Sequence, residues 1–164
     1  MTIAQQGKLN REEVEDTLLD ILIMAYVFGN NDANDSLGTD ISVDIDKMNE
    51  ALYRKFEDKN FAQRIADYVF TGSVEDIMRV AETEVHRDYS AGVYDTAESS
   101  NKQVNKTWET MRDDRVRDTH YFLQGVTVGL NERFYAFDGD SARYPGDFSK
   151  AENNVNCRCY ISVK

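Results

Sequence analysis

The stretch 106-KTWETMRDDRVRDTHYFLQGVTVGL-130 marks a change in the character of the chain. Its first residues alternate and contain the β-favouring Thr107 and Trp108, and its last residues are β-branched, so both ends predict strands. Between them, 115-RVRDTHYFL-123 predicts a short helix that Asp113 or Asp114 caps at its start and Gly125 ends in a left-handed conformation. The order predicted here is strand, short helix, strand.

Downstream, short β-favouring segments separated by turn residues continue to the end of the chain. The segments 133-RFYAF-137 and 158-RCYISV-163 are short and rich in aromatic or β-branched residues, and 139-GDSARYPGD-147 between them has the composition of turns. We therefore expect residues 101–164 to form a small, compact α+β domain with a short antiparallel sheet.

Upstream, apolar residues recur at helical intervals without a proline, which predicts helices. The expected helices cover residues 11–28, ending where Gly29 and several Asn residues begin, then 44–59 and 60–70, and finally a long helix that starts after Ser73 as N-cap. The predicted organisation is a helical segment over 1–75, a long connecting helix over 76–100, and the α+β domain over 101–164. The fold class is α+β.

The composition limits the partners. A net charge of −11 argues against binding of duplex DNA, because neutralising phosphates requires a basic face. The most apolar stretch, residues 18–29, contains Asp20 and is too short to cross a bilayer, and the polar first residues do not look like a signal peptide. We therefore expect no membrane association and a location in the cytoplasm, where a structural disulfide between the two cysteines is not expected.

An ordered set of residues within the last third of the chain is similar to the C-terminal domain of the phage Mu protein F-like family, the minor head or head morphogenesis proteins of tailed phages. The similarity extends back along the predicted long helix to about residue 76. One departure is Glu82, which stands before Thr83 where the family pattern leads us to expect a basic residue. The residues that carry the resemblance are Trp108, Asp114, Arg117, His120, Gly125, Pro145, Gly146, Asn156, Cys157 and Cys159.

The resemblance implies a function in virion assembly. Proteins of this family enter the procapsid in few copies and bind the portal protein or the inner capsid and scaffold. It implies that residues 1–75 are a docking segment for the portal or procapsid. It also implies that the protein is in the cytoplasm of the bacterial host during assembly and in the capsid interior of the virion afterwards.

Cys157 and Cys159 allow two interpretations. On a strand their side chains point to the same face, so the two sulfurs lie close together without forming an easy disulfide. They are then either small buried apolar side chains or thiolate ligands that complete a zinc site with His120. No fourth ligand is evident, and the candidates are His86, Asp114 and Asp118.

The other motif residues have structural interpretations. Trp108 is expected to fill the core of the C-terminal domain, and Gly125, Pro145 and Gly146 are expected to shape turns. Asp113, Arg115 and Arg117 are interpreted as a cap and its ion pairs rather than as catalytic groups.

The sequence favours a non-enzymatic protein, because it contains no phosphate loop, dinucleotide fingerprint, nucleophile elbow or metalloprotease motif. The alternative is a capsid-carried nuclease or transferase-type effector that uses His120 with Asp114 and Asp118.

Overall fold

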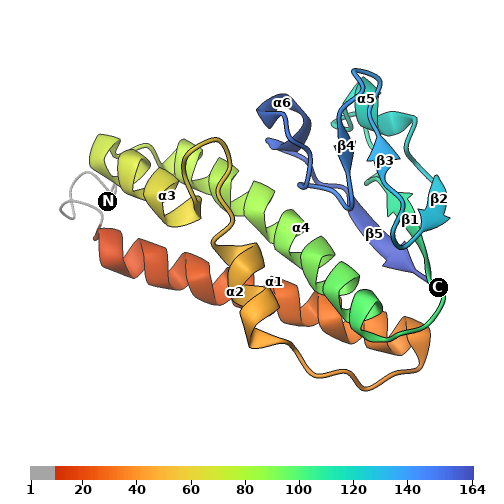
Figure 1. Cartoon of the computed structure of the whole chain (residues 1–164). Helices are drawn as coiled ribbons and strands as arrows, with labels where there is room; N and C mark the ends of the chain where they lie inside the picture. The colour runs from red at the N-terminus through yellow and green to blue at the C-terminus, as the bar shows by residue number, and fades with distance from the viewer. Residues whose placement is uncertain (1–9) are drawn as a thin grey trace.

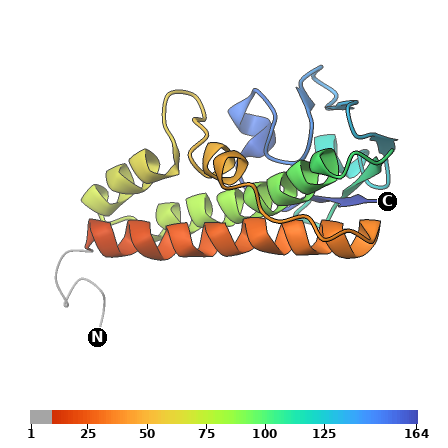
Figure 2. The same cartoon turned by 60° about the horizontal axis from the view of Figure 1, so that its bottom comes forward.

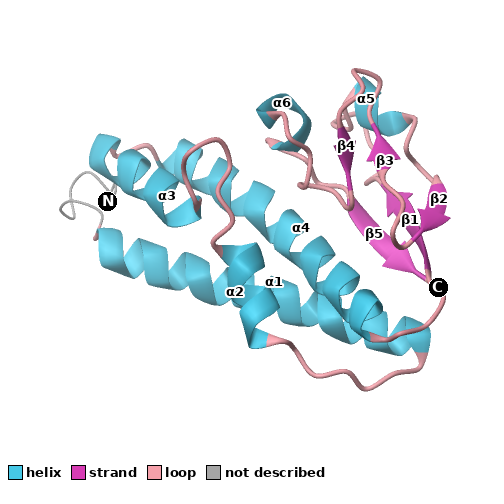
Figure 3. Cartoon of the chain, viewed as in Figure 1, coloured by secondary structure: helices cyan, strands magenta, loops and turns pink. Residues whose placement is uncertain are grey.

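The computed structural model describes residues 10–164 and shows a helical layer followed by a small β-containing part (Figures 1 and 3), which confirms the predicted α+β class. The helical layer contains two long helices that run side by side, with two shorter helices beside them. No helix in the described range 10–164 is long and apolar enough to cross a bilayer. The helices are α1 (Arg11–Leu37), α2 (Ile45–Leu52), α3 (Phe61–Thr71), α4 (Val74–Ser99), α5 (Asp118–Tyr121) and α6 (Ala151–Asn154).

The first helix is longer than predicted. It passes through Gly29 and ends at Leu37, where Gly38 takes the left-handed conformation with φ +62°. Gly29 is helical because α1 packs closely on α4 at this point: a Cβ added to Gly29 would lie 2.1 Å from the carbonyl oxygen of Tyr89. The next residue, Asn30, donates its amide to the Thr96 hydroxyl at 2.7 Å within the same contact. The prediction of a helix end at residue 28 was therefore wrong.

The later helices follow local capping signals. Ser73 is the N-cap of α4 and its hydroxyl accepts from the Asp76 backbone N–H, as predicted. Asn60 caps α3 with a complete capping box, and Asp44 caps α2. The second helix ends at Leu52 rather than at residue 59, because the chain turns through a short bridge between Phe56 and Lys59.

The β part contains two small antiparallel sheets. One has the order β2–β1–β5, formed by Thr127–Gly129, Asn105–Glu109 and Tyr160–Val163, with Trp108 opposite Ile161. The other pairs β3 (Phe134–Tyr135) with β4 (Ser141–Ala142). The predicted strands thus all exist, but several are shorter than their apolar segments. The last strand, β5, lies against α4 and brings the sheet onto the helical layer (Figure 2).

Buried apolar side chains of both parts form one continuous cluster, which runs from Leu22 on α1 to Ile161 on β5. Trp108 is fully buried within it, which agrees with the expectation that it fills the core. The division of the chain at residues 75 and 100 into a docking segment, a connecting helix and a domain stays a prediction. Of the docking segment, residues 1–9 lie outside the described range.

Candidate metal centre

Three soft ligand side chains meet in the interior of the β part. The ligand atoms of His120, Cys157 and Cys159 all lie within 4.8 Å of one another, and all three residues are buried. The Nδ1 atom of His120 is 3.5 Å from the sulfur of Cys157 and 3.8 Å from that of Cys159. These three side chains can hold one metal ion.

The backbone that presents the two sulfurs differs from the prediction. Cys157 and Cys159 precede β5, which begins at Tyr160, so strand alternation does not orient them. The turn that does so has Asn156 at φ +59°, with its backbone N–H donating to the hydroxyl of Thr83 on α4 at 3.0 Å. The prediction that these cysteines lie on a strand was therefore wrong, although the two sulfurs do converge on one side.

Two arginines fix the cysteine segment to the α5 region. Arg117, the N-cap of α5, donates to the carbonyl oxygens of Glu152 and Val155 just before the segment. Arg158, between the two cysteines, donates to both carboxylate oxygens of Asp113 at 2.6 and 2.9 Å. The Asp113 carboxylate therefore pairs with Arg158 and accepts a hydrogen bond from the backbone N–H of Arg115. It does not cap α5, whose N-cap is Arg117, so the prediction of an Asp113 cap was wrong.

Aromatic rings surround the histidine. The imidazole of His120 stacks on Phe148, with centroids 5.5 Å apart, and meets Trp108 edge to face at the same distance. Its Nε2 atom is buried and has no hydrogen-bond partner within residues 10–164.

The two cysteines have pKa values that are shifted in opposite directions. The pKa of Cys157 lies well below that of an ordinary thiol, because a hydrogen bond from the Cys159 thiol and the proximity of His120 stabilise its thiolate and outweigh the effect of burial. The pKa of Cys159 is raised in turn by its neighbour Cys157 and by burial.

The spacing of these atoms fits a tetrahedral zinc ion. Zinc bound to sulfur at about 2.3 Å and to nitrogen at about 2.1 Å holds such ligands about 3.6 Å apart. The two observed nitrogen-to-sulfur distances, 3.5 and 3.8 Å, bracket that value. A cavity of about 10 Å³ adjoins the three side chains, which is close to the smallest volume that accommodates one water molecule. Three protein ligands leave one position of a tetrahedral metal ion to a water molecule or another small ligand.

No fourth side chain completes the group within the described residues. Asp114 and Asp118 are exposed to solvent, and His86 on α4 lies outside the 4.8 Å group. Burial lowers the pKa of His86, while the neighbouring Cys157 and Glu82 oppose that shift. None of the three fourth-ligand candidates therefore belongs to the cluster.

The other motif residues support this part of the fold. Gly125 has the predicted left-handed backbone, with φ +76°, but α5 ends at Tyr121 with Phe122 as its C-cap, so Gly125 shapes the turn after the helix and does not cap it. Its N–H donates to the carbonyl of Trp108 at 2.8 Å. Pro145 and Gly146 lie in a buried turn, where Gly146 has φ +90° and a Cβ there would come within 2.5 Å of the Cγ of Arg87. Arg115 faces Glu82 at 3.6 Å. These positions agree with structural functions as turns and ion pairs.

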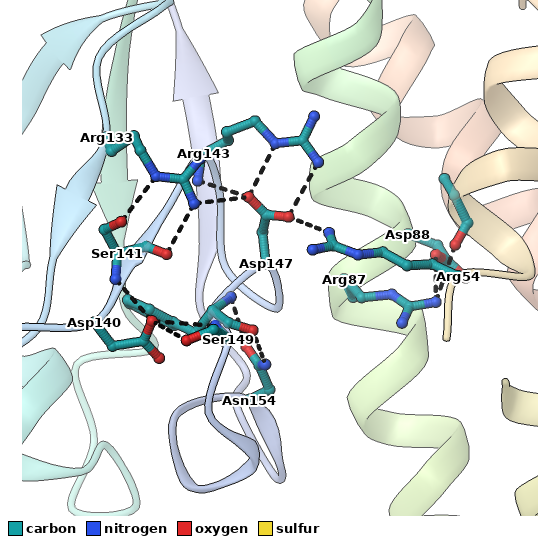
Figure 4. A network of polar contacts seen from close by, with 12 residues as sticks. Arg54, Arg87, Asp88, Arg133, Asp140, Ser141, Arg143, Asp147, Ser149 and Asn154 are labelled. Carbon is teal, nitrogen blue, oxygen red and sulfur yellow. Dashed lines mark hydrogen bonds and ion pairs between the residues drawn. The ribbon is translucent and has the colours of Figure 1, made fainter. Parts of the chain in front are cut away.

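A buried ionic network lies between the turn and α4, and the sequence analysis did not find it (Figure 4). The carboxylate of Asp147, almost fully buried, accepts from Arg143 at 3.0 Å and from Arg54, which follows α2. Burial alone would raise the pKa of Asp147, but the arginines, Arg143 first, hold it below the ordinary value. Arg54 and Asp147 are 93 residues apart, so no local pattern could have indicated the pair.

Lys106 on β1 is also buried, and its burial was not predicted from the sequence. Its ammonium lies 5.1 and 5.3 Å from the ring centroids of Tyr94 and Phe134, and its Nζ has no hydrogen-bond partner in the part of the chain that the structure describes. Burial lowers the pKa of Lys106 to about 8. The sequence pattern could have indicated this burial, because Lys106 and Trp108 are two residues apart on one strand and therefore point to the same, inward face.

Residues 45–162 match the family described as Phage Mu protein F like protein. The chain belongs to this family. The matched range includes the whole His120, Cys157 and Cys159 cluster and begins at α2, so it also includes three of the four helices of the helical layer.

Two characterised proteins are similar to parts of the chain. Minor head protein GP7 of Bacillus phage SPP1 is 37% identical over 83 residues, which are 49% of this chain and 27% of that protein. NAD(+)--arginine ADP-ribosyltransferase EFV of Enterococcus faecalis (strain ATCC 700802 / V583) is 32% identical over 117 residues, or 68% of this chain and 24% of that protein. The chain thus spans about a quarter of the length of these relatives. No solved structure matches it.

Proposed function

We propose that the protein is a minor head protein that acts as a structural component in phage head assembly. The observation that carries the proposal is its membership of the Mu F-like family together with the similarity to minor head protein GP7. The proposed partners are the portal protein and the inner capsid or scaffold of the same phage. The proposed locations are the host cytoplasm during assembly and the capsid interior afterwards. The charge of −11 supports a protein partner over duplex DNA.

The experiment that tests this function is quantification of the protein in gradient-purified procapsids and virions by mass spectrometry. We expect a few copies per particle in both. Deletion of its gene should lower the yield of DNA-filled heads, and expression from a plasmid should restore it. Absence from both kinds of particle, with normal particle yield after deletion, would contradict an assembly function.

The second candidate function is that of a transferase or nuclease effector, which the similarity to the ADP-ribosyltransferase EFV favours. We propose that this chain is not catalytic. His120 is 1% exposed and faces two thiols, while Asp114 and Asp118 are exposed and outside its cluster, so His120 and these carboxylates do not form a pair that a substrate can reach. Incubation with RNA, with DNA, and with NAD plus an arginine-containing acceptor tests this. A product that the purified protein forms and His120→Ala abolishes would contradict it.

We further propose that His120, Cys157 and Cys159 hold a zinc ion. Such an ion would link α5 to the segment before β5 and so supply a cross-link to a part of the chain with short strands. The donor atoms support zinc because thiolate and imidazole are its usual ligands, and the nitrogen-to-sulfur distances have the tetrahedral spacing.

Removal of this ion gives a measurable prediction. Elemental analysis of protein purified without added metal should find about one equivalent of zinc, since a structural site is nearly filled. Cys157→Ser should lose the zinc and lower the melting temperature, and a chelator should lower the melting temperature of the wild type alone. His86→Gln, which changes the only other histidine, is the matched control and should keep the zinc. Less than about a tenth of an equivalent, with melting unchanged by chelator, would leave the cysteines as packing residues.

A further inference from the structure

An apolar groove runs along the surface where α1, α4 and the start of β5 meet. Its volume is about 440 Å³. We call it the α1–α4 groove, and the residues used in the argument are Ile21, Met24, Phe28, His86, Tyr89 and Tyr160.

One wall of the α1–α4 groove is an exposed apolar stripe on α1. Ile21, Met24 and Phe28 follow one another at intervals of three and four residues and are 45%, 55% and 55% exposed. This spacing puts all three side chains on one face of the helix. Large apolar side chains that gather at a groove mark an interaction surface, whereas scattered ones need no explanation. Methionine is common on surfaces that accommodate a partner helix.

The opposite wall is aromatic, and its side chains are fixed by a hydrogen bond and a ring contact. Tyr89 on α4 donates its hydroxyl to Asp32 at 2.6 Å and meets Tyr160 edge to face, with ring centroids 6.3 Å apart. His86 lies one helical turn before Tyr89 on the same helix, and burial lowers its pKa, which favours the neutral imidazole. Both walls are therefore apolar or uncharged, as in a groove that takes the apolar face of a helix.

The rim of the α1–α4 groove is acidic. Helix α1 contains seven acidic residues and a single basic one, Arg11, at its first position. Asp20 lies one turn from Met24, and Asp32 and Asp35 line a second cavity that shares Tyr89 with the groove. At the other end, Glu82 is close enough to His86 to affect its pKa. Two cations lie at this end, and both face carboxylates: Arg158 pairs with Asp113, and Arg115 faces Glu82 itself at 3.6 Å.

We propose that the α1–α4 groove binds an amphipathic helix of a partner protein, whose apolar face is flanked by lysine or arginine residues. The apolar and uncharged walls fit the apolar face, and the acidic rim fits the basic flanks. A second copy of this chain does not fit, because each copy has a net charge of −11 and would bring the same acidic rim against the first. The proposal deepens the assembly function by giving the chemistry of the partner, and it rests on that function only for where the partner comes from.

The test uses the full chain and three fluorescent peptides of about 18 residues, long enough for a helix. One has leucine on one helical face and lysine on the other, one has glutamate in place of lysine, and one is a scrambled leucine and lysine peptide of the same charge. At physiological salt, anisotropy should show that the protein binds the first peptide at least about tenfold more tightly than either of the others. Equal binding of the scrambled peptide, or of the glutamate peptide, would overturn the proposal.

Matched variants locate the binding. Met24→Glu should weaken binding of the leucine and lysine peptide at least about tenfold. Met78→Glu should leave it within about twofold, since Met78 is a similarly exposed methionine, on α4, outside the groove. Ile21→Glu provides a second groove variant, and circular dichroism checks that each variant is folded. Equal losses for the Met24 and Met78 variants would overturn the proposal, as would a wild-type dimer in sedimentation that Met24→Glu dissolves.

The same variants separate this inference from the assembly function. If the protein enters particles and Met24→Glu abolishes entry while Met78→Glu does not, both are supported. If the wild type never enters particles but the peptide results hold, the assembly function fails and the groove stands. If Met24→Glu enters particles normally and binds the peptide as the wild type does, the groove fails and the assembly function stands.

Discussion

Replacing Gly92 with alanine is expected to destabilise the protein by about 3 kcal/mol or more, despite the higher helix propensity of alanine. A Cβ at Gly92 would lie 2.1 Å from the carbonyl oxygen of Tyr26 and 3.0 Å from its carbonyl carbon, both in the backbone of α1. Backbone atoms of a packed helix cannot rotate away as a side chain can, so the two helices would have to separate. Chemical denaturation followed by circular dichroism measures the loss.

Gly38→Ala is the matched control for this experiment. Gly38 has a left-handed backbone with φ +62°, but a Cβ there would meet nothing within 4 Å, so the substitution costs only the strain of about 1 to 2 kcal/mol. Gly29→Ala should resemble Gly92→Ala, because its Cβ would lie 2.1 Å from the carbonyl oxygen of Tyr89. A Gly92→Ala protein as stable as the wild type would mean that α1 and α4 do not pack this closely in solution.

Gly29 shows why one prediction from the sequence, the end of the first helix, was wrong. A glycine followed by asparagines is the usual composition of a helix end, and the letters alone do not say whether a glycine breaks a helix or lets another backbone approach. Only the packing of α4 on α1 distinguishes the two. The Ser73 cap was predictable because its cause is local, within three residues of the serine.

The candidate site divides in the same way. The convergence of His120 with the two cysteines was expected from the family resemblance, and the structure brings those residues together. The turn that orients the sulfurs was not expected, because it depends on Thr83 of α4, which is 73 residues away from Asn156. The buried ionic groups were missed for a similar reason: charged residues on a helix are usually solvated, and only tertiary contacts reveal which of them are covered.

Arg87 is the second position where a large effect is expected, since its guanidinium is buried among carboxylates on α4 (Figure 4). It pairs with Glu84 at 2.5 Å and Asp88 at 3.5 Å, and it donates to the carbonyl of Ala51 at 3.0 Å. The turn at Gly146 packs directly on its aliphatic part. Burial raises the pKa of Asp88 to about 8, against the opposing attraction of Arg87.

Arg87→Met should therefore cost about 3 to 5 kcal/mol near neutral pH, because it leaves the buried Asp88 without its partner and Glu84 with Arg64 alone. The loss should be smaller at pH 5 than at pH 8. An acid whose folded-state pKa is raised binds more protons when folded, so its unfavourable contribution grows as the pH rises toward that pKa, and losing Arg87 raises the pKa of Asp88 further. Arg79→Met is the matched control on the same helix: its side chain is 40% exposed and pairs with Asp76, so it should cost at most about 1 kcal/mol at either pH. If denaturation at pH 5 and pH 8 gave Arg87→Met the same small, pH-independent loss as Arg79→Met, the cluster would contribute no more than a solvated surface pair.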